Sequence, residues 1–215
     1  MLISIIHPSL GRPVQARKCY DHWIDTCSGE HEIEWIVSLN RTDAEIENYE
    51  QCFIGADVVL LKTNSKNMVQ ATNEAAKVCS GDLLILVSDD MFSPEMWDSR
   101  ILNEYEMIDG AGILQVYDGI TAQKLTIPIM NRLAYIKLGY MYHPEYISMY
   151  ADDDLRKTAL THGMLYNATD IFIEHRHFMN GKAKYDKTYA LENSQKAMSH
   201  GQKLYYERAK LNFPI

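Results

Sequence analysis

An alternation of short apolar runs with helix-like segments over residues 1–117 most constrains the fold of this chain. The apolar runs cover residues 2–7, 32–39, 57–62, 82–87 and 111–117, and the helix-like segments cover residues 14–27, 43–53, 67–79 and 94–107. Apolar strands separated by such segments are typical of βαβ units, in which a parallel sheet is buried between helices. We therefore predict an α/β fold with a Rossmann-like, mostly parallel sheet flanked by helices.

The regular alternation ends at residue 118. Residues 126–150 are rich in Pro, Met and Tyr, residues 152–163 and 188–212 have helical character, and residues 170–174 form a late apolar run. The length of 215 residues fits a single domain. We divide it into residues 1–117, 118–187 and a C-terminal helix over 188–215.

Composition excludes several classes of protein. The chain is 47% hydrophobic and 23% charged, which is typical of a globular protein and not of a disordered one. A net charge of −8 argues against general nucleic-acid binding. No apolar run approaches the roughly 20 residues of a transmembrane helix, and the N-terminus has no secretory signal pattern. The four cysteines lack C-x-x-C spacing, so we predict reduced thiols and a cytoplasmic location.

Two acidic residues follow the most apolar of these runs. Asp89 and Asp90 follow residues 83–87 after a single residue, Ser88, and ligands of open α/β sheets bind at the carboxyl ends of strands. Adjacent carboxylates there are costly unless a positive group joins them, and Mn²⁺ or Mg²⁺ is the simplest such group. The alternative is a solvated turn, but Ser93 is a better cap for the helix that follows.

Three further segments carry candidate functional groups. His175 and His177 alternate on an extended segment and point the same way, so either could complete a metal site; the alternative is a structural histidine. Residues 152–154 are three aspartates at a helix start, where they favour the helix dipole or supply a general base. Arg12 follows the first strand in a loop that could bind a phosphate or form a structural turn.

In chain order, these segments resemble the GT-A glycosyltransferases, in particular small inverting, family-2-like enzymes of bacteria and their phages. Residues 4–13 resemble the first strand and nucleotide loop, and residues 80–82 (Ser-Gly-Asp) resemble the turn before the metal strand. Residues 88–90 (Ser-Asp-Asp) stand at the Asp-x-Asp position, and residues 151–155 (Ala-Asp-Asp-Asp-Leu) match the Glu-Asp-x-Asp-Leu segment. The late His-x-His matches the third metal ligand.

The resemblance implies a GT-A domain with a nucleotide-sugar-binding half (1–117), an acceptor and catalytic half (118–187) and a tail helix. It implies these site residues: Asp152 or Asp153 as catalytic base; Pro8, Ser9, Arg12, Asn40, Asn67, Asn73 and Asp89 around the nucleotide sugar; and Asp90 with His175 or His177 on Mn²⁺ or Mg²⁺. Ser88 replaces the first Asp of Asp-x-Asp, which makes Asp90 the direct ligand. Asn40 lies where the family often has aspartates that hold the base, so the base is not assigned.

The function implied is metal-dependent transfer of a sugar from a nucleoside-diphosphate sugar to an acceptor hydroxyl, with inversion. The acceptor is open among glycan, glycolipid, protein and modified base, as is the oligomeric state. One alternative is a non-catalytic binding module with the same fold. A second is a nucleotidyltransferase, although residues 7–13 lack the Gly-rich, basic character typical of its triphosphate loop. We expect residues 126–150, with Met130, Tyr140, Tyr142, His143 and Tyr146, to form either the acceptor side or a packing layer.

Overall fold

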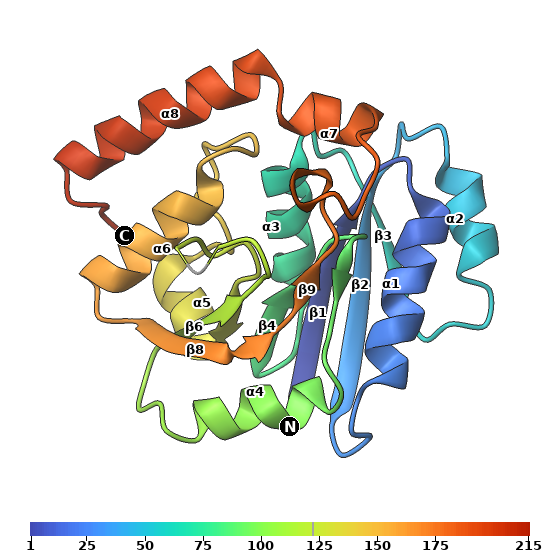
Figure 1. The fold of residues 1–215 in the computed structure, drawn as a ribbon, viewed down its shortest axis with the longest axis horizontal. Helices are drawn as coiled ribbons and strands as arrows, with labels where there is room; N and C mark the ends of the chain where they lie inside the picture. Colours follow the sequence, from blue (N-terminus) through green and yellow to red (C-terminus); the bar gives the residue numbers. More distant parts are fainter. Residues whose placement is uncertain (122) are drawn as a thin grey trace.

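The computed structural model describes residues 1–121 and 123–215, which form an α/β/α arrangement around one main sheet (Figure 1). The strands of this sheet are β1 (Leu2–Ser9), β2 (Glu32–Asn40), β3 (Val59–Thr63), β4 (Leu83–Leu86), β6 (Ile113–Tyr117), β7 (Ile129–Asn131) and β8 (Leu165–Phe172). Their order across the sheet is β3-β2-β1-β4-β7-β6-β8. The neighbouring strands pair in parallel, except that β7 is antiparallel to both β4 and β6. The predicted mostly parallel α/β fold is therefore confirmed.

Strand β4 shows why the central strands are apolar throughout. Leu83 and Ile85 pack in a core on one face of the sheet, whereas Leu84 and Leu86 pack in a second core on the other. Alternate side chains of a strand point to opposite faces, so a strand covered on both sides needs an unbroken apolar run.

Helices cover both faces of the sheet. The first core includes residues of α1 (Pro13–Asp25), α2 (Ile46–Cys52) and α4 (Trp97–Tyr105). The second includes residues of α3 (Met68–Val78), α5 (Arg132–Leu138), α6 (Ala151–Thr161) and α8 (Gln195–Lys210). No helix in the described parts of the chain is long and apolar enough to cross a membrane. All four cysteines are free; Cys19 and Cys79 are buried, whereas Cys27 and Cys52 are partly exposed.

The structure differs from the sequence predictions mainly after residue 118. Helix α5 and strand β7 lie within the region 126–150, for which we predicted no element. The predicted strand at 170–174 is the end of β8 followed by a separate short strand, β9 (Glu174–His175). The predicted helix 188–212 is two helices, α7 (Lys187–Glu192) and α8, because the Ser194 side chain accepts a hydrogen bond from Ala197 N and starts a new helix.

Two closer details also differ. Thr42 and Glu45 have the spacing of a capping box, but no such box forms, and α2 begins at Ile46 without a side-chain cap. Instead, Asn40 Oδ1 accepts hydrogen bonds from the backbone and side chain of Thr42. Gly201 in α8 lies against the chain before α6, where an added Cβ would be 2.2 Å from the Met149 carbonyl oxygen. Glycine is therefore required for α8 to pack here.

Candidate active site

A cavity of about 760 Å³ lies beside the carboxyl ends of β1, β2 and β4. Ten of the residues singled out from the sequence line it: Pro8, Ser9, Arg12, Asn40, Asn67, Asp89, Asp90, Asp152, His175 and His177. Asn73 and Asp153 are outside this lining. The topology thus brings segments from both halves of the chain around one space, as expected for the carboxyl edge of a parallel sheet.

Asp89 is held by residues at the end of β1. It is 6% exposed, and its Oδ1 lies 2.9 Å from Nε2 of His7 and accepts a 2.7 Å hydrogen bond from the Ser9 hydroxyl. The Ser9 hydroxyl is in turn 2.6 Å from the hydroxyl of Tyr49 in α2. Because one carboxylate oxygen takes both contacts, the Asp89 side chain is fixed while its second oxygen stays free of hydrogen bonds to the described residues.

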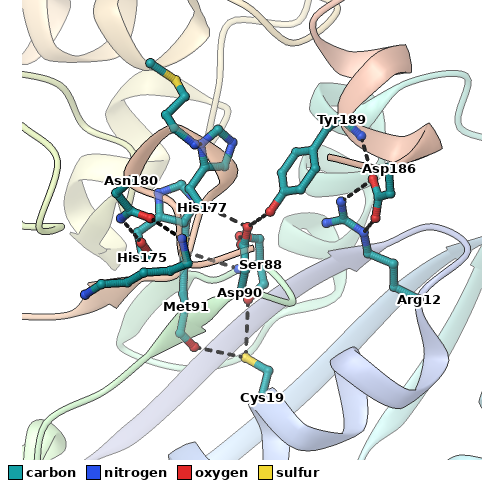
Figure 2. Close-up of polar contacts among 12 residues, drawn as sticks. Arg12, Cys19, Ser88, Asp90, Met91, His175, His177, Asn180, Asp186 and Tyr189 are labelled. Carbon is teal, nitrogen blue, oxygen red and sulfur yellow. Dashed lines mark hydrogen bonds and ion pairs between the residues drawn. The ribbon is translucent and has the colours of Figure 1, made fainter. Parts of the chain in front are cut away.

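Asp90 is the centre of a second polar network (Figure 2). Its Oδ1 accepts a 2.6 Å hydrogen bond from the Ser88 hydroxyl, and its Oδ2 accepts one of 2.5 Å from the Tyr189 hydroxyl. Nε2 of His175 lies 3.4 Å from Oδ2. Burial raises the pKa of Asp90, but the contacts with His175, Ser88 and Tyr189 outweigh burial and hold this pKa well below its ordinary value. Asp90 is therefore an anion in a largely buried position.

A small antiparallel pair of strands places His175 beside Asp90. β5 (Met91–Phe92) pairs with β9 so that Met91 faces His175, and Arg176 N donates to the Asp90 carbonyl at 2.7 Å. His177, two residues after His175, contacts the following turn instead of Asp90: its Nδ1 accepts a 3.3 Å hydrogen bond from Met179 N. Burial and the neighbouring His175 lower the pKa of His177 to about 4.

Arg12 lines the cavity next to Tyr189, as Figure 2 shows. Its guanidinium donates two hydrogen bonds, of 2.8 and 2.6 Å, to the carboxylate of Asp186, and it lies 4.2 Å from the centre of the Tyr189 ring. Burial lowers the pKa of Arg12, but Asp186 and Asp89 more than offset this effect. Arg12 is thus a cation held between a carboxylate and an aromatic face.

Asp152 lies in the first turn of α6 with a 22% exposed side chain. The amine of Lys124 is 3.7 Å from Asp152 and 2.8 Å from Asp153. Burial raises the pKa of Asp152, Lys124 opposes this shift, and the like charge of Asp153 adds to it. Asp154 is fully buried and accepts a 2.7 Å hydrogen bond from Nε of Arg208. The three adjacent aspartates therefore have three different environments, and only Asp152 among them lines the cavity.

The three asparagines make mainly structural contacts. Asn67 caps α3 by accepting from Gln70 N, and Asn40 Nδ2 donates to the Ser65 carbonyl at 2.7 Å. Asn73 binds the backbone of residues 141–142 through both ends of its amide, with hydrogen bonds of 2.7 to 3.2 Å. Asn73 thus anchors the loop after α5 rather than lining the cavity.

Residues 126–150 contribute in two ways. Met130, Tyr142 and Tyr146 are buried in the core, as the packing-layer alternative predicted, although Tyr142 also borders the cavity. Ile147, Ser148 and Met149 contribute further to the lining.

Several lining residues were not identified from the sequence: Asp118, Lys124, Tyr189 and Glu192. Tyr189 and Glu192 belong to α7, which reaches the cavity only because the chain folds back over the loop after β1. Thr188, for example, donates to the Leu10 carbonyl at 3.0 Å. The sequence does contain a signal for the start of α7, because Asp186 caps this helix by accepting a hydrogen bond from Tyr189 N. This cap does not predict that α7 packs against the loop after β1.

The described residues do not form a group of three or more His, Cys, Asp or Glu that could hold a metal ion. The pair of Asp90 and His175 nevertheless suits Mn²⁺ or Mg²⁺, since a carboxylate oxygen and an imidazole nitrogen face each other across 3.4 Å at the cavity wall. Such ions keep several waters and share substrate phosphates with one or two protein ligands. The donor set fits an ion that is completed by its ligand.

No protein-family model and no curated protein sequence matches the chain. Solved structures do match. The Pyrobaculum calidifontis mannosyltransferase PcManGT, solved with GDP-Man and Mn²⁺, has a TM-score of 0.60 at 11% identity over 97% of this chain and 75% of its own. Residues 1–349 of S. aureus TarS with UDP give 0.62 at 14%, over 99% and 72%.

A third match is glucosyl-3-phosphoglycerate synthase of Mycobacterium tuberculosis, solved with Mn²⁺, UDP and phosphoglyceric acid. It gives a TM-score of 0.61 at 13% identity, over 82% of this chain and 71% of its own. The chain has the GT-A fold of nucleotide-sugar glycosyltransferases. At these identities the likeness concerns the fold, and the chemistry has to be argued from the cavity.

Proposed function

We propose that this protein is a metal-dependent glycosyltransferase that moves a sugar from a nucleoside-diphosphate sugar to an acceptor hydroxyl with inversion. The observation that carries the proposal is the meeting of the Asp90–His175 pair, Arg12 and Asp152 around one cavity of a GT-A fold. The fold neighbours solved with GDP-Man or UDP and Mn²⁺ support the same class of ligand.

Asp90 and His175 would hold Mn²⁺ or Mg²⁺, which supplies positive charge to stabilise the departing diphosphate. Arg12 is a cation in the cavity lining that could bind a phosphate. Its Nε and Nη2 donate to Asp186, so a phosphate would share the guanidinium with this carboxylate. Asp89, fixed through one oxygen, has the other available for a ribose or sugar hydroxyl. These residues bind and orient the donor.

Asp152 is the proposed general base. It would take the proton of the acceptor hydroxyl as this oxygen attacks the anomeric carbon and the bond to the diphosphate breaks. A carboxylate whose pKa is raised holds a proton more strongly, so burial makes Asp152 a better base than an exposed aspartate. One displacement of this kind inverts the anomeric configuration.

Replacement of Asp90 by asparagine tests the metal assignment. Removing a residue that only hydrogen-bonds a metal ligand lowers metal affinity by about 10- to 100-fold. Asp90 is a proposed ligand itself, so we expect Asp90→Asn to weaken Mn²⁺-dependent donor binding by at least this factor. Isothermal titration with and without Mn²⁺ measures the effect. The matched control is Asp21→Asn, since Asp21 pairs with Arg17 on the surface of α1, away from the cavity lining. Unchanged metal-dependent binding by Asp90→Asn would remove Asp90 from the site.

Lys124 provides a pH test of the base. Its charge lowers the pKa of Asp152, which burial and Asp153 raise. The base acts when ionised, so kcat/KM should rise with pH through a value above the ordinary aspartate pKa of about 4. Lys124→Met removes the positive charge, which should move this acidic limb to higher pH, whereas Asp153→Asn should move it to lower pH. Coincident pH profiles for the two variants and the wild type would contradict the assignment.

The binding-module and nucleotidyltransferase alternatives predict different products. A binding module shows metal-dependent binding without turnover of a donor. A nucleotidyltransferase releases pyrophosphate from a nucleoside triphosphate, whereas the proposed enzyme releases a nucleoside diphosphate from its sugar. Product analysis after incubation with each class of donor separates the three.

A further inference from the structure

Glu192 is a cavity residue with no role in the mechanism above. It is the last residue of α7 and lines the cavity. Its backbone carbonyl accepts a 2.9 Å hydrogen bond from Ser148, which fixes its place beside the chain that leads to α6. Within residues 1–121 and 123–215, its carboxyl group makes no hydrogen bond or salt bridge.

The charges around Glu192 do not favour a carboxylate. Burial raises its pKa to about 7; Arg12 opposes the shift, and Asp89, Asp90 and Asp186 add to it. A half-buried acid among like charges, without a protein partner, destabilises the folded chain. A strongly perturbed group of this kind in a cavity is a candidate for ligand binding.

The position of Glu192 indicates which part of a ligand it would meet. It lies one helical turn after Tyr189, whose hydroxyl donates to Asp90. Its own carbonyl is held by Ser148, four residues before Asp152, and Asp90, Asp152 and Glu192 line the same cavity. In the proposed reaction, the transferred sugar must lie between the diphosphate at Asp90 and the base at Asp152, because the acceptor attacks the anomeric carbon from the face opposite the diphosphate.

We propose that Glu192 binds hydroxyl groups of the transferred sugar and selects neutral hexose donors against uronic-acid donors. This inference rests on the proposed function. A carboxylate accepts hydrogen bonds from sugar hydroxyls, and it repels a sugar that carries its own carboxylate. Asp89, Asp90 and Asp152 line the same cavity and add to this repulsion. Two of the cations there are paired with carboxylates, Lys124 with Asp152 and Asp153 and Arg12 with Asp186.

The test is a set of dissociation constants measured by isothermal titration with Mn²⁺ at pH 8. The probes are UDP, UDP-glucose and UDP-glucuronic acid, with GDP and GDP-mannose in parallel. The proteins are the wild type, Glu192→Ala, Glu192→Gln and the matched control Glu95→Gln, since Glu95 is an exposed residue before α4 and outside the cavity lining. Thermal unfolding of each variant shows that it is folded.

The wild type should bind the hexose nucleotide more tightly than the diphosphate alone. Glu192→Ala should reduce this advantage by about tenfold or more, the effect of losing hydrogen bonds to a charged group, and leave diphosphate binding unchanged. Glu192→Gln should improve binding of UDP-glucuronic acid, because it removes the charge and keeps the shape. Glu95→Gln should behave as wild type.

Two results would overturn the assignment. In one, Glu192→Ala keeps the full advantage of the hexose nucleotide over the diphosphate. In the other, it weakens the diphosphate and the hexose nucleotide equally, which would place Glu192 at the phosphates instead. Failure of the wild type to bind any of these nucleotides with Mn²⁺ would overturn the proposed function itself, and the Glu192 assignment with it.

Discussion

Asp152→Asn should lower the rate of sugar transfer by about 10²- to 10⁴-fold, the usual contribution of a general base. The asparagine side chain keeps the size and polarity of the aspartate but cannot take the proton of the acceptor hydroxyl. Binding of the nucleotide sugar with Mn²⁺ should persist, because Asp90, His175 and Arg12 are unchanged. Rates at saturating donor, together with donor dissociation constants, measure the two effects separately.

Asp153→Asn is the matched control, since Asp153 is adjacent in sequence, pairs with Lys124 and does not itself line the cavity. It should keep most of the transfer activity. A severe loss in Asp153→Asn with near-normal transfer by Asp152→Asn would show that the base is one residue further along. Loss of donor binding in Asp152→Asn would show that Asp152 belongs to the donor site.

Asp154→Ala should destabilise the fold by about 3 to 5 kcal/mol, as expected when one partner of a buried ion pair is removed. Asp154 is 0% exposed and Arg208 is 7% exposed, and the Tyr146 hydroxyl also donates to Asp154 at 3.0 Å. The loss of Asp154 leaves the Arg208 guanidinium buried without its carboxylate. Denaturant unfolding measures the change in the free energy of unfolding.

The surface pair of Arg17 and Asp21 is the comparison for this experiment. Its side chains are 31% and 46% exposed, so Asp21→Ala should cost less than about 1 kcal/mol. The double variant Asp154→Leu with Arg208→Met should recover much of the lost stability, because apolar pairs can replace buried ion pairs. A loss below about 1 kcal/mol in Asp154→Ala would contradict the role of this pair in holding α8 against α6.

The central part of the fold could be predicted because its signal is local. Residues 83–86 are apolar at every position, since both faces of β4 are covered. Short elements carry no such signal: β5 and β9 have two residues each and exist only because each pairs with the other. The break between α7 and α8 did have a signal, the cap at Ser194, that the overall helical character of residues 188–212 concealed.

The candidate site divides in the same way. Asp89 and Asp90 could be placed from the sequence because they follow a buried strand, and the sheet edge is a known place for ligands. The positions of Tyr189 and Glu192 could not be predicted, because they depend on the packing of α7 over the loop after β1. The contacting residues Thr188 and Leu10 are 178 residues apart in the sequence. The three aspartates at 152–154 look alike in sequence. In the fold, Asp154 pairs with Arg208, Lys124 lies near both Asp152 and Asp153, and only Asp152 lines the cavity.

The cavity is proposed to bind a nucleoside-diphosphate sugar together with a divalent metal. Thermal unfolding with UDP-, GDP-, dTDP- and CDP-sugars, with and without Mn²⁺, measures this binding. A ligand at 100 times its dissociation constant stabilises the folded state by about 2.7 kcal/mol, which raises the unfolding temperature measurably. We expect a rise that needs both Mn²⁺ and one class of nucleotide and that is lost in Asp90→Asn. No rise with any donor, with or without the metal, would contradict the proposed binding.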